Sequence, residues 1–150
     1  MTVRAWFTIS ALVLAALAAA FAFRLFAPTP VPEIIVRVGD RRIEGALERF
    51  CWPQRNALRC GDGEEREPEA ATIPPSGSFR FVVTSPAQPR EGSITLTDAR
   101  TGRRVLGRGW TRTLRYELGP GRYTLDVTAG DTGGAFVDYT FELIVTRSGS

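Results

Sequence analysis

Apolar and polar residues alternate with a period of two over most of the chain from Glu33 to Thr146. Successive side chains of a β-strand point to opposite faces, so each alternating run predicts a strand with one core face and one solvent face. Gly, Pro, Asp and Ser residues that favour turns separate the runs. The clearest runs are residues 34–38, 79–84, 93–97, 113–118, 123–128 and 138–145. This pattern predicts an all-β fold, an antiparallel β-sandwich of seven or eight strands, with helix limited to a turn or two at residues 44–50.

The N-terminal end has a different pattern, because the chain is uncharged from Ala5 to Phe23 between Arg4 and Arg24. As a helix this run would extend roughly 28 Å, close to the hydrocarbon thickness of a bilayer. We favour an uncleaved transmembrane helix with a short cytoplasmic end, because the run is longer than the apolar region of a typical signal peptide. The alternative is a signal peptide, cleaved after one of the small-residue motifs at 18–20 or 20–22.

The composition divides the chain into four parts. Residues 1–26 form the membrane anchor or signal segment. Residues 27–32 carry alternating prolines, which favour an extended, stiff spacer. Residues 33–147 form the extracytoplasmic β-sandwich domain, and residues 148–150 form a disordered tail. The length of the chain allows one ordinary domain beside the N-terminal segment.

One local motif sharpens the prediction of the fold. Residues 118–123 read Leu-Gly-Pro-Gly-Arg-Tyr and lead into an alternating strand. This motif resembles the tyrosine corner of immunoglobulin-like sandwiches, in which a tyrosine hydroxyl bonds to nearby backbone. The resemblance covers residues 118–145 and implies an immunoglobulin-like topology, but it implies no activity.

A wider resemblance joins four separate stretches of the chain. They are Gly39-Asp40, Cys51-Trp52, the Pro-Gly-Arg-Tyr of residues 120–123 and the Tyr-Thr-Phe-Glu-Leu-Ile-Val of residues 139–145. In these stretches the chain resembles uncharacterised membrane-anchored extracytoplasmic proteins of bacteria. The resemblance implies a class and a location at the cell membrane, and it implies no activity.

Cys51 and Cys60 are the only cysteines, and the chain has no histidine. A redox pair would be expected as Cys-x-x-Cys at a helix N-terminus, and two cysteines cannot complete a four-ligand zinc site. We favour a disulfide across a long hairpin or loop, with two buried free thiols as the alternative. Disulfides persist outside the cytosol, so this bond places the residues after Arg24 outside the cytoplasm. Trp52 is expected to pack over the disulfide and the edge of the core, with an exposed platform for a ligand as the alternative.

The charge of the chain is nearly balanced once the N-terminal segment is set aside. All 19 basic residues are arginine, and removing Arg4 and Arg24 from the net charge of +3 leaves +1 for the remainder. Such a balance gives no reason to expect a nucleic-acid partner. The acidic segment Asp62–Glu69 is interpreted as a solvated loop, with a cation or a basic partner as alternatives.

A second cluster is rich in arginine and contains no acid. It predicts contact with an anion, because guanidinium groups bind phosphate and carboxylate through two parallel hydrogen bonds. The partner would be an anionic envelope polymer, lipid head groups or an acidic protein face; the alternative is a polar surface without a ligand. The candidate contact residues are Arg103, Arg104, Arg108, Trp110 and Arg112.

The absence of histidine also bears on catalysis. It removes the usual general base at neutral pH and every Ser-His-Asp or Cys-His arrangement. We therefore expect no enzyme, no catalytic residue, no metal and no cofactor. The sequence favours a non-catalytic, single-pass, membrane-anchored binding or assembly module of the cell envelope, and it carries no signal for an oligomeric state. The alternatives are a secreted structural β-sandwich released by signal cleavage and a small glycan-acting enzyme that uses two carboxylates.

Overall fold

The computed structural model of the chain describes residues 13–22, 30–54, 57–63, 66–84 and 88–146. The chain divides into two compact units, Met1–Pro30 and Val31–Ser150. In the first unit, residues 13–22 are helical. Within the described residues, no helix has the length and apolar character needed to cross a bilayer. The rest of the predicted apolar run (residues 5–12 and 23) and the predicted tail at 148–150 lie outside the described residues, so the anchor and the tail stay predictions.

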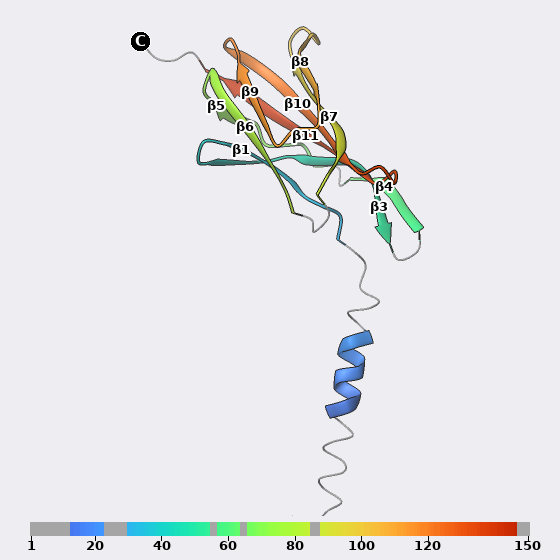
Figure 1. Ribbon diagram of the computed structural model, residues 1–150. Coiled ribbons are helices and arrows are strands. Elements are labelled where there is room, and N and C mark those ends of the chain that lie inside the picture. Colours follow the sequence, from blue (N-terminus) through green and yellow to red (C-terminus); the bar gives the residue numbers. More distant parts are fainter. Residues whose placement is uncertain (1–12, 23–29, 55–56, 64–65, 85–87, 147–150) are drawn as a thin grey trace, which may run out of the picture. The chain divides into compact units, whose positions relative to one another are not determined.

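The second unit contains eleven strands in its described part, which form two sheets (Figure 1). The small sheet has the order β2-β1-β6-β9, and the large sheet has the order β4-β3-β11-β10-β7-β8, with β5 paired to the end of β11. The strands are β1 (Ile34–Val38), β2 (Arg41–Glu44), β3 (Ala46–Gln54), β4 (Ala57–Asp62), β5 (Ala71–Ile73), β6 (Ser76–Val83), β7 (Glu91–Asp98), β8 (Arg104–Gly109), β9 (Thr113–Glu117), β10 (Gly121–Gly130) and β11 (Phe136–Val145).

The all-β prediction is confirmed, but the strand count differs from the predicted seven or eight. The additional strands lie at sheet edges, where little of the strand is buried: every residue of β4 is exposed, and β8 has only one partly buried residue. Residues 44–50, where a turn of helix was expected, contain the end of β2 at Glu44, the connecting Gly45 and the first part of β3. The pairing is also not wholly antiparallel, because β5 runs parallel to β11.

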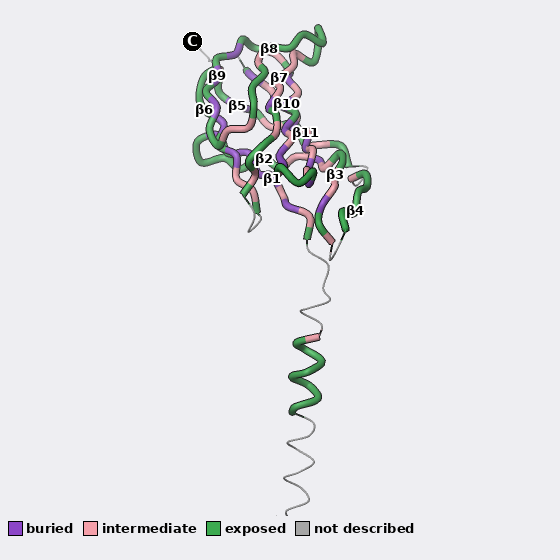
Figure 2. The backbone as a smooth tube through the Cα atoms, turned by 45° about the vertical axis from the view of Figure 1, so that its right-hand side comes forward, coloured by how far each residue is buried: buried purple, intermediate pink, exposed green. Residues whose placement is uncertain are grey.

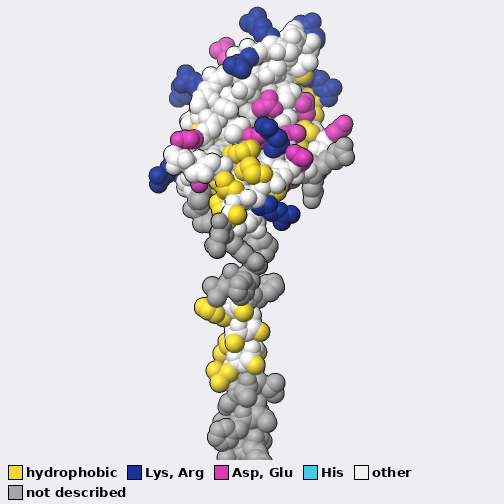
Figure 3. Space-filling view, turned by 90° about the vertical axis from the view of Figure 1, so that its right-hand side faces the viewer, with side chains coloured by type: hydrophobic (Ala, Val, Ile, Leu, Met, Phe, Trp, Pro, Cys, Tyr) yellow, Lys and Arg dark blue, Asp and Glu magenta, His cyan; other side chains and the backbone are white. Residues whose placement is uncertain are grey.

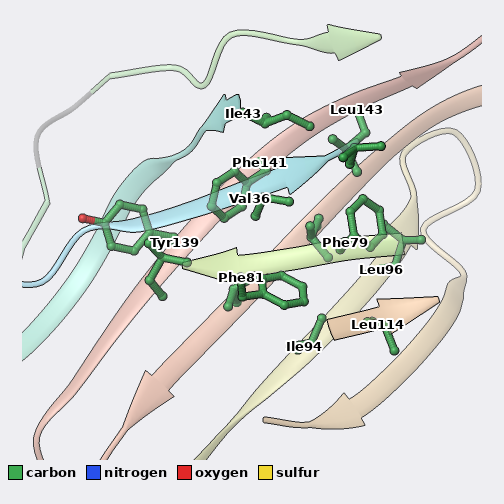
Figure 4. Close-up of a cluster of buried hydrophobic side chains, with 14 of the residues drawn as sticks. Val36, Ile43, Phe79, Phe81, Ile94, Leu96, Leu114, Tyr139, Phe141 and Leu143 are labelled. Carbon is green, nitrogen blue, oxygen red and sulfur yellow. The ribbon is translucent and has the colours of Figure 1, made fainter. Parts of the chain in front are cut away.

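Apolar side chains from the two sheets meet in a single core (Figure 4). Figure 2 shows the buried residues spread along the strands of the second unit. Val36 and Phe79 of the small sheet and Leu96, Phe141 and Leu143 of the large sheet are fully buried. Burying each side chain of this size contributes about 1.5–3 kcal/mol relative to leaving it exposed. The alternation along β6, β7, β10 and β11 therefore reflects the face that each strand turns toward the opposite sheet.

Two buried residues near the starts of strands, Pro32 before β1 and Tyr123 in β10, hold the chain against this core. Pro32, which the sequence assigns to the spacer, is fully buried and belongs to the second unit. At the other site, the Tyr123 hydroxyl donates a 2.8 Å hydrogen bond to the carbonyl oxygen of Gly119. This is the hydroxyl-to-backbone bond that the motif at residues 118–123 predicts.

Candidate functional site

Cys51 and Cys60 form the predicted disulfide. They lie directly opposite each other in the antiparallel β3–β4 hairpin, with their Cα atoms 4.0 Å apart. Directly opposed residues of two antiparallel strands bring their Cβ atoms close together, which is why the hairpin can be bridged here. The side chain of the next residue, Trp52, is only 8% exposed and packs in the core. It therefore strengthens the core edge, as expected, and does not present a flat ring to solvent.

The predicted arginine cluster begins at the turn between β7 and β8. Asp98 organises this turn, because its Oδ1 accepts hydrogen bonds of 2.9 Å from the backbone N–H groups of Arg100 and Thr101. The Thr101 N–H bond is the main cause of a lowered pKa at Asp98. Gly102 completes the turn with a φ of 67°, a left-handed conformation that favours glycine. Arg103 follows the turn as an exposed residue immediately before β8.

An irregularity in the pairing of β7 with β8 separates two of the predicted arginines. The register shifts between Leu96 and Thr97, so Arg104 lies opposite Thr97 whereas Arg108 lies opposite Ile94. Ile94 is fully buried and points into the sandwich, so the partly exposed Thr97, three residues on, points outward. Arg104 and Arg108 consequently lie on opposite faces of β8, although their even spacing in the sequence suggests one face.

Trp110 and Arg112 have partners of their own. The Trp110 ring lies 6.0 Å from the ring of Phe81, tilted by 50°, and packs against the core. Arg112 donates from Nη2 to Oε1 of Gln88 over 3.2 Å, and its carbonyl oxygen accepts the N–H of Phe81. The five predicted residues therefore do not form one continuous patch. Arg103, Arg104 and Arg108 are exposed, and none of them forms an ion pair with an acidic residue in the described part.

A different set of arginines is brought together on the outer face of the small sheet. Arg42 of β2 pairs with Arg37 of β1, and Arg37 pairs with Arg80 of β6. Arg115 of β9 lies opposite Ser78, two residues before Arg80 on the same strand. We call Arg37, Arg42, Arg80 and Arg115 the arginine row. The row is not apparent from the sequence, because each arginine is only the polar member of an ordinary alternating run and strand pairing alone makes them neighbours.

The carboxylates of the large sheet are engaged by neighbouring side chains on its outer face. Thr140 donates to Asp126 over 2.9 Å, Thr124 donates to Glu142 over 3.0 Å, and Arg49 pairs with Asp138 over 2.7 Å. On the face of the molecule in Figure 3, arginine and acidic side chains are interspersed rather than separated. These acids occupy strand positions where neighbouring side chains already engage them.

The acidic segment Asp62–Glu69 lies only partly in the described structure, because residues 64 and 65 fall outside it. Across the described residues, no group of three or more Asp, Glu, Cys or His side chains is arranged to hold a metal ion. A groove of about 470 Å³ is lined by Glu69 together with Arg41, Arg42 and Glu44, among other residues. Within this lining, Arg41 donates a 2.8 Å hydrogen bond from Nη1 to the carbonyl oxygen of Thr72.

No protein-family model and no curated protein matches this chain. The chain's own residues therefore carry the functional inference.

Proposed function

We propose that this protein is a non-catalytic, membrane-anchored binding or assembly module of the cell envelope, whose second unit is an immunoglobulin-like β-sandwich outside the cytoplasm. The Cys51–Cys60 disulfide supports the location, because such bonds persist outside reducing compartments. The apolar run from Ala5 to Phe23 supports the anchor. The bond from Tyr123 to Gly119, in a fold of two packed sheets, supports the immunoglobulin-like assignment.

The observation that carries the binding role is the exposed arginine of the β7–β8 hairpin. Arg103, Arg104 and Arg108 hold no ion pair with any described acid, so their guanidinium groups are available to an external anion. The anion would be an envelope polymer, lipid head groups or an acidic protein face. A membrane tether would raise the effective concentration of the hairpin near such a partner and so strengthen a weak contact.

The test compares the full-length chain with an Arg104→Glu/Arg108→Glu variant for retention on native envelope material over a series of salt concentrations. The variant should be retained less, and the difference should shrink as salt screens exposed charges. Arg90→Glu/Arg122→Glu is the matched control, because it reverses two exposed arginines outside the hairpin. Equal retention of wild type and the hairpin variant at every salt concentration would reject the role of the hairpin.

Two single variants then separate the faces of β8. Because Arg104 and Arg108 lie on opposite faces, a ligand that approaches one face should be sensitive to one substitution more than to the other. A similar loss from both would indicate a partner that wraps the edge of the large sheet.

A secreted structural protein is the second candidate, and the small-residue motifs at 18–20 and 20–22 favour it. N-terminal sequencing of native material distinguishes the two. A start at Met1 or Thr2 supports the anchor, and a start near Phe21 or Phe23 supports secretion.

A further inference from the structure

The arginine row places like charges directly opposite one another in the small sheet. Arg37 faces Arg42 on one side and Arg80 on the other. Neighbouring strands lie about 4.8 Å apart, so the three positions span roughly 10 Å of the outer face. Arg115 extends the row diagonally from Arg80, because it lies opposite Ser78. All four arginines are exposed, so they are directed to solvent and not to the core.

This arrangement is unfavourable for the fold by itself. Like charges directly opposite across an antiparallel pair repel and destabilise the sheet. Arg42 is compensated, because its Nη2 lies 3.0 Å from Glu33 and its Nε lies 3.2 Å from Glu44. Arg37, Arg80 and Arg115 form no ion pair with any acidic residue that the structure describes. A ligand that supplies negative charge to these three would relieve the repulsion.

The next position across the sheet holds Thr113, which adds no charge and so causes no repulsion between like charges. It continues the row on β9, directly opposite Arg80, and it is a β-branched residue suited to an exposed strand. A neutral residue at Arg37 or Arg80 would therefore satisfy the sheet equally well. The charged side chains are better explained by something outside the fold.

The chemistry of the row favours phosphate over carboxylate. One guanidinium fork satisfies both oxygens of a planar carboxylate, whereas a tetrahedral phosphate has further oxygens to accept hydrogen bonds from a second and third fork. The row lies on the face of a sheet, and each exposed contact with one anion is weak. An extended polymer with repeated phosphates makes several such contacts at once.

We propose that Arg37, Arg80 and Arg115 bind an extended, phosphate-bearing polyanion across the outer face of the small sheet. This site is separate from the β7–β8 hairpin and does not depend on the proposed role of that hairpin. Binding would place phosphates over the positions where arginines face one another, so the ligand would also stabilise the fold.

The decisive variant is Arg37→Glu, studied in the full-length chain in a neutral detergent with linear inorganic polyphosphate as the probe. The new carboxylate would lie between Arg42 and Arg80, so the thermal midpoint of unfolding should rise. The dissociation constant for polyphosphate should nevertheless increase about tenfold or more, which corresponds to the loss of roughly 1.4 kcal/mol of binding free energy. A variant that is more stable and binds less cannot owe its weaker binding to misfolding.

Arg122→Glu is the matched control, because Arg122 is an exposed strand residue of the large sheet with the same charge reversal. Its affinity should stay within about twofold of wild type. Arg80→Thr is the second variant, chosen to match the residue at Thr113, and it should weaken binding without reversing a charge. Wild-type affinity in Arg37→Glu or Arg80→Thr, or an equal loss in Arg122→Glu, would overturn the proposal.

Three further probes test the chemistry of the ligand. Orthophosphate should bind much more weakly than polyphosphate, and polyglutamate of matched charge should bind more weakly and respond less to Arg37→Glu. Equal binding of polyglutamate would overturn the assignment of phosphate. If Arg37→Glu loses binding only to vesicles that contain anionic phospholipid, the ligand is a membrane surface and the polymer assignment fails.

The Arg104→Glu/Arg108→Glu variant separates this inference from the proposed function. It should bind polyphosphate as wild type does, even if it is retained less on envelope material. If it loses polyphosphate binding while Arg37→Glu keeps it, the arginine row is not the site and the hairpin proposal stands.

Discussion

The hydroxyl of Tyr139 donates a 3.1 Å hydrogen bond to the carbonyl oxygen of Pro32, 107 residues earlier in the chain. Tyr139 lies in β11 of the large sheet, and Pro32 lies two residues before β1 of the small sheet. Both residues are buried, and the Tyr139 ring stacks near Phe141 at a centroid distance of 6.3 Å. The bond therefore ties the start of the second unit to its last strand and satisfies a carbonyl that burial removes from water.

Replacing Tyr139 with Phe should keep the packing and remove this bond. The free energy of unfolding should fall by about 1–2 kcal/mol, because the Pro32 carbonyl would lose its partner in a buried site. Urea denaturation at pH 7 measures the change. An unfolding midpoint equal to that of wild type would show that the bond contributes nothing to stability.

The difference in stability between wild type and Tyr139→Phe should also depend on pH. Burial, with a smaller effect of the Glu33 charge, raises the pKa of Tyr139 to about 12 from its ordinary value of 10.0. The folded state therefore holds this proton more tightly than the unfolded state, and the resulting stability is complete below pH 10 and lost as the pH rises toward 12. The difference in stability between wild type and Tyr139→Phe should shrink across that window. Tyr116, whose pKa burial also raises, is present in both proteins and cancels.

The disulfide should contribute to stability by restricting the unfolded chain. Cys51 and Cys60 are nine positions apart, and a loop of this length is expected to contribute about 2.5–3 kcal/mol on the chain-entropy model. A Cys51→Ala/Cys60→Ala variant should lose about this much in urea denaturation, and reductant should produce the same loss in wild type. In the described sheet β4 (Ala57–Asp62) is an edge strand held by its pairing with β3. Proteolysis of the variant should therefore increase first within Ala57–Asp62.

The control is the double variant treated with reductant, which should not change further. Mass spectrometry without reduction should show Cys51 and Cys60 in one linked fragment. Two alkylatable thiols in freshly purified envelope material would contradict both the bond and the compartment inferred from it.

The sequence predicted the interior of the fold better than its edges. The strands β6, β7, β10 and β11 alternate cleanly because each turns one face to a core and the other to water. The exposed β4 and β8 lack this contrast, so periodicity could not define them. The parallel pairing of β5 with β11 involves only three residues and leaves no periodic signal.

The sequence alone also could not show which exposed side chains of the candidate sites lie next to each other. Arg104 and Arg108 are close in the sequence, but the shift of register between Leu96 and Thr97 puts them on opposite faces of β8. Distant residues, such as Arg37 and Arg80, become direct neighbours because β1 pairs with β6. Alternation predicts which side chains point outward, but strand order and bulges decide which of them share a surface. The disulfide was accessible to sequence reasoning because only two cysteines exist.

The last prediction concerns the close packing of Gly45 against the core. Gly45 lies between β2 and β3, and a Cβ atom there would lie 2.6 Å from Cε1 of the Phe141 ring. Phe141 is fully buried, so its ring has little room to move. Gly45→Ala should therefore lower the free energy of unfolding by about 1–3 kcal/mol, the usual cost of overpacking a core. Gly109→Ala is the matched control, because a Cβ there would have its nearest neighbour 4.0 Å away.

The control should change stability by no more than about 0.5 kcal/mol in the same urea titration. Adding Phe141→Leu to Gly45→Ala should recover part of the loss, because the smaller side chain vacates the volume that the new methyl group needs. The two substitutions should therefore cost less together than the sum of their separate effects, as residues in contact do. Strict additivity would mean that Gly45 and Phe141 do not touch, and the packing of β11 against the β2–β3 connection would then be wrong.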